Sequence, residues 1–358
     1  MVTSYLRRAH SSFAAHVVDI PPRLLAFLLL LLLAVLPVLN LNPYIIGILI
    51  SANVLAIFAA SWDLLVGRSG QMSLGHALFF GIGAYSTALL HKYYALPAWI
   101  TIPIAVAIGT AVGVLIGFPC LRIKGPYLAL VTMAFPIILT SVVYTLRDIF
   151  GGEFGVRNVP AFFPSLPIEQ QKIAEYYLTL LMLFISATVL YKIANSHTGI
   201  VFVSILDDEL AAKASGINVT KYKLMAFAIS GLFASLAGCL LAHLIRVASP
   251  PTLSLTMSFS VVIVTFLGGI GTIYGPLLGA YIYYIIDRYI LTIVAPVPYE
   301  WIDAKLLIFT IIVAILVIKW PRGLGRFVTD KLEDFEEARD IDERGPKIWK
   351  TYKKKEKK

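Results

Sequence analysis

Three polar side chains stand inside an apolar, glycine-rich stretch of this chain. Residues 61–90 read SWDLLVGRSGQMSLGHALFFGIGAYSTALL, and Gln71, Ser73 and His76 lie among the glycines. An amide, a hydroxyl and an imidazole can hydrogen-bond a polar solute, and polar groups within a membrane segment commonly mark a substrate or proton pathway. We therefore take Gln71, Ser73 and His76 as translocation-pathway candidates. The structural alternative is that His76 bonds a neighbouring helix while Gln71 and Ser73 cap a helix end.

A second stretch of the same kind lies near the other end of the chain. Residues 266–280 read FLGGIGTIYGPLLGA and contain Thr272 among their glycines. When the chain is displaced by 200 residues, residues 71–75 align with residues 271–275. Transporters often form their midplane site from paired, interrupted helices, so we hypothesise that the two stretches are a pseudo-symmetric pair lining the pathway. The further pathway candidates are Thr272 and, after the break at Gly125 and Pro126, Thr132.

The glycines of these stretches have a separate expected role. Small residues allow helices to approach closely in lipid, and broken helices are tolerated where protein or an aqueous cavity covers the freed backbone. The glycines that we assign to helix packing or to hinges are Gly70, Gly75, Gly81, Gly83, Gly268, Gly269, Gly271 and Gly275.

The composition places both stretches in a membrane protein. Of 358 residues, 58% are hydrophobic and only 14% are charged, and the mean hydropathy is +0.82. A soluble domain of this size could not bury so much apolar surface. A helix needs about 20 apolar residues to cross a bilayer, and apolar runs of that length recur from end to end. Helical spans are therefore predicted, since a helix satisfies its own backbone groups in lipid.

We predict an all-α integral membrane fold of about ten transmembrane helices, some of them interrupted or re-entrant. The expected spans are residues 24–41, 43–61, 74–90, 97–118, 127–145, 176–194, 224–245, 257–270, 274–293 and 304–318. Thirteen of the 30 Lys and Arg residues lie from Lys319 onward, which places both termini in the cytoplasm by the positive-inside rule. The expected regions are a cytoplasmic N-terminal segment (1–23), a transmembrane domain (24–320) and a charged cytoplasmic tail (321–358).

The net charge of +9 does not indicate nucleic-acid binding, because the excess lies in the chain ends. The last nine residues, KTYKKKEKK, are expected to lie near anionic lipid headgroups. Cys120 and Cys239 fall within or beside expected spans, where a free thiol acts as a small apolar side chain. The sequence therefore implies no disulfide, no metal site and no cofactor.

The most informative loop, residues 195–223, is expected on the cytoplasmic side. Its residues 198–214 carry apolar side chains at helical spacing, which predicts one amphipathic helix on the membrane surface. Gly216 is the expected C-cap of that helix, and Lys221 and Lys223 precede the next span. A pattern E-x-A-A-x-x-x-G is formed by Glu209, Ala211, Ala212 and Gly216.

This pattern resembles the cytoplasmic coupling motif of ABC importer permeases, and the surrounding sequence extends the likeness. The supporting segments are GQMSLGHALFFGIGAY (70–85), DDELAAKASGINVTKYKLMAFAISGLFASLAG (207–238), FLGGIGTIYGPLLGA (266–280) and WPRGL (320–324). Together they resemble the LivM-type permease subunits of branched-chain amino-acid ABC transporters over about residues 24–324. The chain departs from that family in the 34 residues after Leu324, which are rich in Asp, Glu and Lys.

The resemblance implies an importer of leucine, isoleucine and valine in the cytoplasmic (inner) membrane. It implies three kinds of partner: a second, homologous permease chain, two cytoplasmic ATPase chains and an extracytoplasmic solute-binding protein. Residues 209–216 would then form the helix seated on an ATPase. The sequence has no G-x-x-x-x-G-K-[ST] phosphate loop, so ATP hydrolysis is expected on the separate chains and this chain is not an enzyme.

Three alternatives follow from the same residues. Permeases for urea or short amides share the pattern, and they would move a different solute. An ion-coupled carrier would need charges that titrate or pair in mid-membrane, whereas Asp287 and Arg288 are expected as an interfacial pair near the outer end. An intramembrane enzyme would need clustered carboxylates or metal ligands at membrane depth, and the sequence contains no such cluster.

Overall fold

The structure is a computed structural model that describes residues 42–120, 123 and 125–287, together with the isolated positions 33, 37, 311 and 315. All of these except Leu33 and Pro37 belong to one compact unit, Asn42–Gly325. The expected N-terminal segment 1–23, the expected spans 24–41 and 304–318 and the tail 321–358 lie outside the continuously described residues.

The described residues are almost entirely helical. Five helices are long and apolar enough to cross a membrane: Pro43–Arg68, Ala98–Cys120, Tyr127–Thr145, Ile168–Ala194 and Val219–Ile245. The helical elements are α3 (Pro43–Asp63), the π-helix η2 (Leu64–Arg68), α4 (Ala77–Tyr94), α5 (Ala98–Cys120), α6 (Pro126–Thr145), α7 (Arg147–Phe150), the 3₁₀ turn η3 (Gly152–Phe154), α8 (Ile168–Ala194), α9 (His197–Asp207), α10 (Glu209–Ala214), α11 (Val219–Ile245), the 3₁₀ turn η4 (Pro250–Leu253), α12 (Leu255–Gly268) and α13 (Tyr274–Tyr284). The protein is thus an all-α, multi-pass membrane protein.

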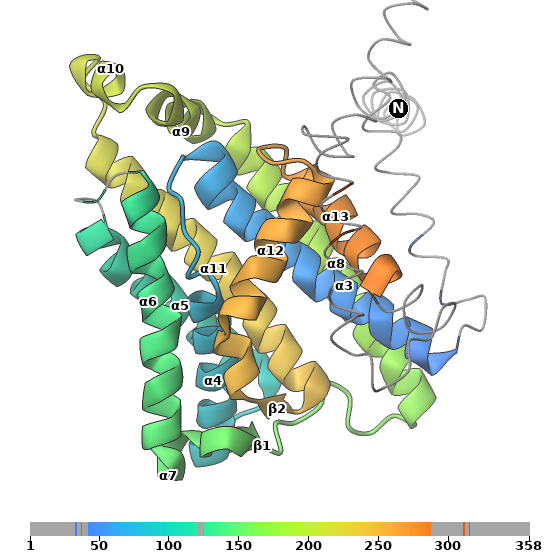
Figure 1. Cartoon of the computed structure of the whole chain (residues 1–358). Coiled ribbons are helices and arrows are strands. Elements are labelled where there is room, and N and C mark those ends of the chain that lie inside the picture. The colour runs from blue at the N-terminus through green and yellow to red at the C-terminus, as the bar shows by residue number, and fades with distance from the viewer. Residues whose placement is uncertain are drawn as a thin grey trace, which may run out of the picture. The chain divides into compact units, whose positions relative to one another are not determined.

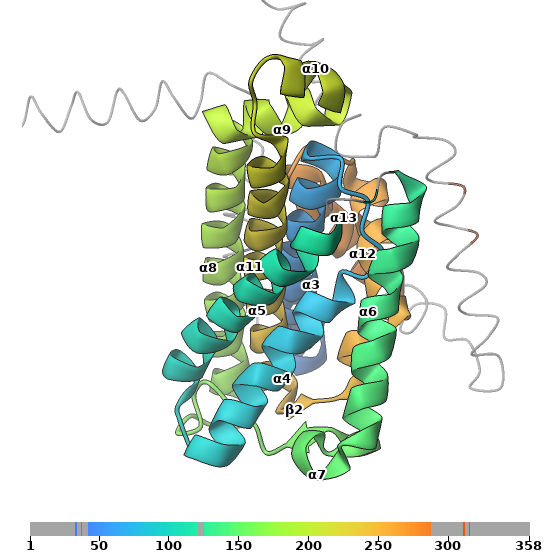
Figure 2. The same ribbon diagram turned by 90° about the vertical axis from the view of Figure 1, so that its left-hand side faces the viewer.

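Helix α11 forms the centre of the described bundle. It packs against α3, α4 and α5, while α3 also packs against α8 and α13, and α12 packs against α13. Figure 1 shows α9 and α10 at one end of these helices, and α7 with the strands β1 (Val156–Arg157) and β2 (Val247–Ala248) at the opposite end. Figure 2 shows that α6 stands at the edge of the bundle, where most of its surface is exposed.

Small residues allow the close approach of α4 and α11. At Gly83 a β-carbon would collide with the carbonyl oxygen of Ser235, and at Gly238 a β-carbon would collide with the carbonyl oxygen of Phe80. The thiol of Cys239 also donates to the carbonyl oxygen of Gly83 at 3.3 Å. This contact is backbone against backbone, as expected for helices that associate without a hydrophobic driving force.

Several helix boundaries differ from the sequence-based expectation. Helix α8 begins at Ile168, eight residues before the expected span 176–194, because Pro167 starts the helix and Gln171 bonds Glu175 across one turn at 2.7 Å. Helix α12 ends at Gly268, two residues before the end of the expected span 257–270, and α13 gives way to a π-turn after Tyr284. Residues 288–293 of the expected span 274–293 lie outside the described residues. The two-residue antiparallel pair of β1 and β2, with Val156 opposite Ala248, was not expected at all.

Candidate functional site

The first glycine stretch is a break between two helices. At the end of α3 the backbone widens into the π-helix η2, and the amide of Gln71 then bonds the carbonyl oxygen of Leu65 at 3.0 Å. Gly70 takes a φ of +69°, which an L side chain adopts only with strain. Residues 70–75 form no helix, and α4 begins at Ala77. Wide helical turns of this kind occur frequently at functional sites.

The polar residues of this break are buried and bonded within it. The Gln71 side chain donates to the carbonyl oxygen of Ser69 at 3.0 Å, and the carbonyl oxygen of Ser73 accepts from Trp62 Nε1 at 2.7 Å. The hydroxyl of Thr132 on α6 accepts from the amide of Leu74 at 3.1 Å. The structure therefore brings Gln71, Ser73 and Thr132, three of the predicted pathway candidates, to one break in the helices.

Gly75 lets the break lie against α6. A β-carbon at Gly75 would collide with the carbonyl oxygen of Thr132, so this position has no room for a side chain. Gly81, one turn into α4, likewise faces the side chain of Leu253 with no room for a β-carbon. Both glycines thus lie at close contacts, which is the placement that helix packing in lipid favours.

His76 is completely buried at the start of α4. Its ring stacks on Phe58 with the centroids 5.1 Å apart, and its Nε2 lies 2.9 Å from the hydroxyl oxygen of Ser61. The Ser61 hydroxyl already donates to the Phe58 carbonyl, so it must accept here, and Nε2 of His76 carries the proton. Nδ1 has no hydrogen-bond partner among the described residues. The Ser230 hydroxyl oxygen on α11 also lies 3.5 Å from Nε2, and this enclosure by aromatic rings and two serines favours a packing role for His76 over solute contact.

The second glycine stretch is also a break, between α12 and α13. Gly269, Gly271 and Ile273 all take positive φ values, +117°, +80° and +58°. Thr272 closes this turn, because its hydroxyl donates to the carbonyl oxygen of Gly269 at 2.7 Å and accepts from the amide of Gly275 at 3.0 Å. A β-carbon on Gly268 would collide with the carbonyl oxygen of Gly275, so the two helices touch at the turn.

A buried carboxylate that the sequence analysis missed joins the two breaks. Asp63, the last residue of α3, is fully buried and accepts from the amides of Gly271 at 2.5 Å and Ile273 at 3.0 Å. Gly67 makes room for this contact, since a β-carbon there would lie 2.7 Å from the Gly271 nitrogen. Converging backbone amides in a turn with positive φ form an anion-binding concavity, and Asp63 fills it. An acidic residue at the end of an apolar run, four residues before a glycine, was the available signal.

A second missed cluster lies nearer the N-terminal end of α3. The side-chain nitrogen of Asn53 donates to the hydroxyl of Thr179 on α8 at 3.1 Å, and the hydroxyl of Tyr281 on α13 donates to the side-chain oxygen Oδ1 of Asn53. Asn53 and Thr179 are fully buried. Side-chain bonds between helices stabilise membrane bundles, so this cluster ties three helices together.

The expected single helix 198–214 is wrong: the segment contains two helices. Asp208 lies between α9 and α10 with extended backbone (φ −153°, ψ 106°), and its carboxylate accepts from the amides of Leu210 at 2.8 Å and Ala211 at 3.0 Å. An aspartate that caps a helix in this way stops the preceding helix, which helical spacing alone does not reveal. Gly216, with φ +82°, follows the end of α10 as expected for a glycine after a helix.

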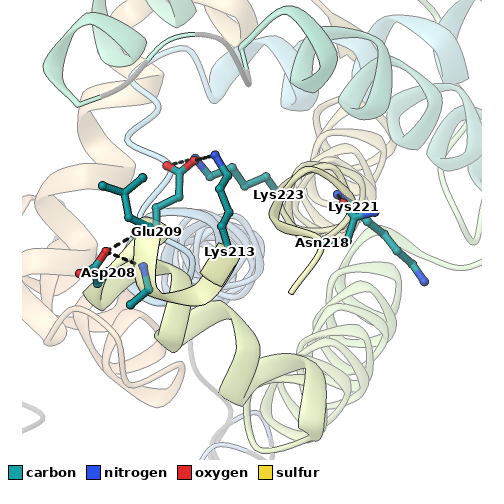
Figure 3. Close-up of polar contacts among 8 residues, drawn as sticks. Asp208, Glu209, Lys213, Asn218, Lys221 and Lys223 are labelled. Atoms are coloured by element: carbon teal, nitrogen blue, oxygen red, sulfur yellow. Dashed lines mark hydrogen bonds and ion pairs between the residues drawn. The ribbon is translucent and has the colours of Figure 1, made fainter. Parts of the chain in front are cut away.

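The four residues of the E-x-A-A-x-x-x-G pattern have different surroundings. Ala212 is buried against Val201, Ile205 and Val219, whereas Ala211 is exposed on the opposite side of α10. Nothing lies within 4 Å of the position that a β-carbon on Gly216 would occupy. Glu209 points toward Lys213 and Lys223 (Figure 3).

Glu209 forms two ion pairs with side chains of its own chain. Its carboxylate lies 2.8 Å from Lys213 Nζ on α10 and 2.8 Å from Lys223 Nζ on α11, and only 6% of the Lys223 side chain is exposed. Partial burial alone would raise the pKa of Glu209, but the hydrogen bonds and charges of the two lysines outweigh it and lower the pKa from 4.5 to about 2. The ion pairs thus hold α10 against the first turns of α11.

These ion pairs should be insensitive to pH in the physiological range. Because the folded-state pKa is depressed, the stabilisation is complete above the ordinary glutamate pKa and is lost as the pH falls toward the folded-state pKa of about 2. We expect the difference in apparent melting temperature between the wild type and Glu209→Gln to stay constant from about pH 8 to about pH 5 and to shrink below about pH 4. Thermal unfolding in detergent across that range measures it. A difference that already shrinks between about pH 7 and pH 6 would contradict the assignment.

A cavity joins the α9–α10 segment to the first break. It has a volume of about 200 Å³. Its lining residues are Ser69, Gly70, Gln71, Ile123, Gly125, Leu128, Ile205, Leu206, Glu209 and Lys223. The structure therefore brings Gln71 and Gly70 of the predicted pathway to the same small space as Glu209 of the predicted coupling pattern. Thr272 lies instead in the second break, which contacts the first break at Asp63 and Gly67.

Comparison with known proteins covers both breaks and the α9–α10 segment. The family model described as “Branched-chain amino acid transport system / permease component” matches residues 44–317. No solved structure matches the chain.

Individual relatives are similar to parts of this chain. Two high-affinity branched-chain amino acid transport system permease proteins named LivM, from Salmonella typhimurium and Escherichia coli K12, are each 32% identical to this chain over 61% of its length. The chain spans only 57% of the length of each of these two relatives. The ribose import permease protein RbsC of Haemophilus influenzae is 26% identical over 71% of this chain and 80% of that protein.

Proposed function

This chain belongs to the family of permease components of branched-chain amino acid transport systems, and from that premise we propose that it is the membrane-spanning permease subunit of an ATP-driven importer. The importer takes up leucine, isoleucine and valine across the cytoplasmic membrane. The observation that carries this proposal is the family match over residues 44–317, which includes both helix breaks and the α9–α10 segment. The permease domain of residues 24–320 then contains about ten spans, with both termini in the cytoplasm.

The proposed assembly contains partners that supply what this chain lacks. A second, homologous permease chain completes the pathway, and an extracytoplasmic solute-binding protein delivers the substrate at the end that carries α7, β1 and β2. Two cytoplasmic ATPase chains bind at the opposite end, where α9 and α10 lie (Figure 1). The exposed side chain of Leu210 on α10, 70% accessible, supports this docking face.

The proposed mechanism is alternating access driven by the ATPases. ATP binding brings the ATPase pair together, which displaces the α9–α10 segment and reorients the packed helices. The pathway candidates in this scheme are Gln71, Ser73, Thr132 and Thr272 at the two breaks, with His76 supporting the wall. The glycines of both breaks provide the backbone freedom that such a change requires.

A relative that is a ribose import permease aligns over most of this chain, so the fold is compatible with different solutes. The solute-binding protein can supply the selectivity. The second candidate substrate class is urea and short amides, because permeases for these solutes share the sequence pattern of this chain. Competition of labelled leucine uptake by isoleucine, valine, urea and acetamide separates the two classes.

Purification from native membranes tests the assembly. The tagged chain is purified in mild detergent and its stoichiometric partners are identified by mass spectrometry. Recovery of a second multi-span chain together with ATPase chains that carry a phosphate loop is the expected result. Recovery of the chain alone in several detergents, with uptake that collapses with an uncoupler rather than with ATP depletion, would replace the proposal with an ion-coupled carrier.

The coupling role of α10 makes a separate prediction. Glu209→Gln removes the charge that holds α10 to Lys223, and Gly216→Val forces a side chain into a left-handed backbone position. We expect each variant to lower the leucine taken up per ATP hydrolysed by about tenfold in proteoliposomes, as for loss of a coupling free energy. Lys221→Gln is the matched control, because Lys221 has an exposed side chain in the first turn of α11, close to Lys223 in the sequence. This variant should leave the ratio unchanged. Unchanged ratios in both test variants would refute this role of the segment.

A prediction for His76 separates packing from transport. The buried ring fills the space between Phe58, Phe79 and Ser61, so His76→Ala leaves a cavity and should destabilise the protein by roughly 2 kcal/mol or more. Uptake per folded molecule should remain near the wild-type rate. The measurements are thermal unfolding and uptake normalised to folded protein. Loss of uptake with unchanged thermal stability would instead assign His76 to the pathway.

A further inference from the structure

We infer that Leu206 is the positioning residue through which the α9–α10 segment acts on the membrane interior, by its contact with the helix break at Gly70. This inference rests on the proposed function, in which the same segment receives motion from an ATPase. It adds the place where that motion enters the membrane domain, which neither the coupling pattern nor the family match specifies.

The contact between Leu206 and Gly70 is close and depends on the glycine. A β-carbon at Gly70 would lie 2.8 Å from Leu206 Cδ1 and 3.4 Å from Leu206 Cα, so Leu206 occupies the space that a side chain would need. Gly70 also requires its positive φ to turn the chain out of η2. A displacement of the C-terminal end of α9 therefore presses directly on the backbone of the break.

The ion pairs of Glu209 fix the junction of α9 and α10, so Leu206 moves together with the α9–α10 segment. Glu209 comes three residues after Leu206, and its carboxylate binds the buried Lys223 on α11 and Lys213 on α10. Asp208, which lies between Leu206 and Glu209 in the sequence, ends α9 and caps α10. The α9–α10 junction is thus held at a defined position on α11, with Leu206 directed at the break.

The break passes the contact on to the second glycine stretch. The π-helix η2 ends at Arg68, two residues before Gly70. Gly67 within η2 leaves room for the turn at Gly271, and the carboxylate of Asp63, the residue just before η2, accepts from the Gly271 amide. The contact between Leu206 and Gly70 is therefore linked to both breaks, because the Asp63 carboxylate at the first break binds backbone amides of the second. Energetic coupling between distant sites is carried by such chains of packed groups when the elements they join have two arrangements.

The test compares uptake per ATP hydrolysed in reconstituted transporter with its partner chains. Leu206→Ala removes the contact at a side chain that is 44% exposed, so the folded protein should be retained. Leu206→Met keeps the reach and volume of the side chain. Leu181→Ala is the matched control, because Leu181 is an exposed leucine of α8 that lies outside the α9–α10 segment and both breaks. ATPase co-purification and thermal unfolding are measured for every variant.

The expected result is that Leu206→Ala keeps the ATPase bound and hydrolysing ATP but lowers uptake per ATP by about tenfold, while Leu206→Met and Leu181→Ala remain near wild type. An unchanged ratio in Leu206→Ala, an equal loss in Leu181→Ala, or no recovery in Leu206→Met would overturn the inference. If the wild type itself binds no ATPase and shows no ATP-dependent uptake, the proposed function fails, and the inference fails with it. The wild-type measurement thus separates the two failures.

Discussion

Replacing Asp63 with alanine should abolish uptake and lower the thermal stability of the protein. The Asp63 carboxylate is the acceptor for the amides of Gly271 and Ile273, of which Ile273 is fully buried and Gly271 is half-buried. Leaving the buried Ile273 amide without an acceptor costs roughly 1–3 kcal/mol, and loss of the Gly271 bond adds to this cost. The turn between α12 and α13 would also lose its attachment to α3. Thermal unfolding in detergent and uptake in proteoliposomes measure the two effects.

Conservative and matched variants make this prediction specific. Asp63→Asn keeps the shape and one carbonyl acceptor, so we expect an intermediate loss of stability. Asp148→Asn, at an exposed aspartate on α7, changes the same chemical group outside the bundle and should keep the thermal stability of the wild type. If Asp63→Ala keeps wild-type stability and uptake, the two helix breaks do not depend on the carboxylate that lies between them.

Gly83→Ala should lower both the thermal stability of the protein and the yield of folded protein, and more strongly than a methyl group added at Gly47 on α3. A β-carbon at this position would meet the Ser235 carbonyl oxygen, which belongs to the backbone of α11 and cannot rotate away. The helices must therefore separate, and overpacking of this kind costs about 1–3 kcal/mol or more. The measurement is the apparent melting temperature together with the fraction of monodisperse protein after extraction.

The matched control is Gly47→Ala on α3. The nearest atom to a β-carbon at Gly47 is Lys172 Nζ at 3.9 Å, so the added methyl group has room. Alanine should be neutral there or stabilising by up to about 1 kcal/mol, because it favours the helix over glycine. Equal losses in both variants would mean that the α4–α11 approach is no closer than an ordinary helix contact.

The structure places the predicted site residues in different surroundings, and the differences have physical causes. Gln71, Ser73 and Thr132 meet at the first break, as a pathway hypothesis requires, yet they bond the break itself, and the Thr132 hydroxyl also donates to the carbonyl oxygen of Ala129 on α6. The segment 198–214 has the periodicity of one helix, but the local bond of the Asp208 carboxylate to the next amides ends it. Side-chain bonds to nearby backbone compete with helix formation, and apolar periodicity does not register them.

The sequence by itself determined the membrane class, the positions of most helices within the described residues, the two glycine stretches and the E-x-A-A-x-x-x-G pattern. These are local properties, because hydropathy and glycine content act on neighbouring residues along one helix. Only the tertiary structure decided that Asp63 binds the turn at Gly271, that Glu209 pairs with Lys223, and that Leu206 fits against Gly70. Two of these three contacts join residues more than a hundred positions apart, and two of them use backbone amides or absent side chains, which leave no periodic mark in a sequence.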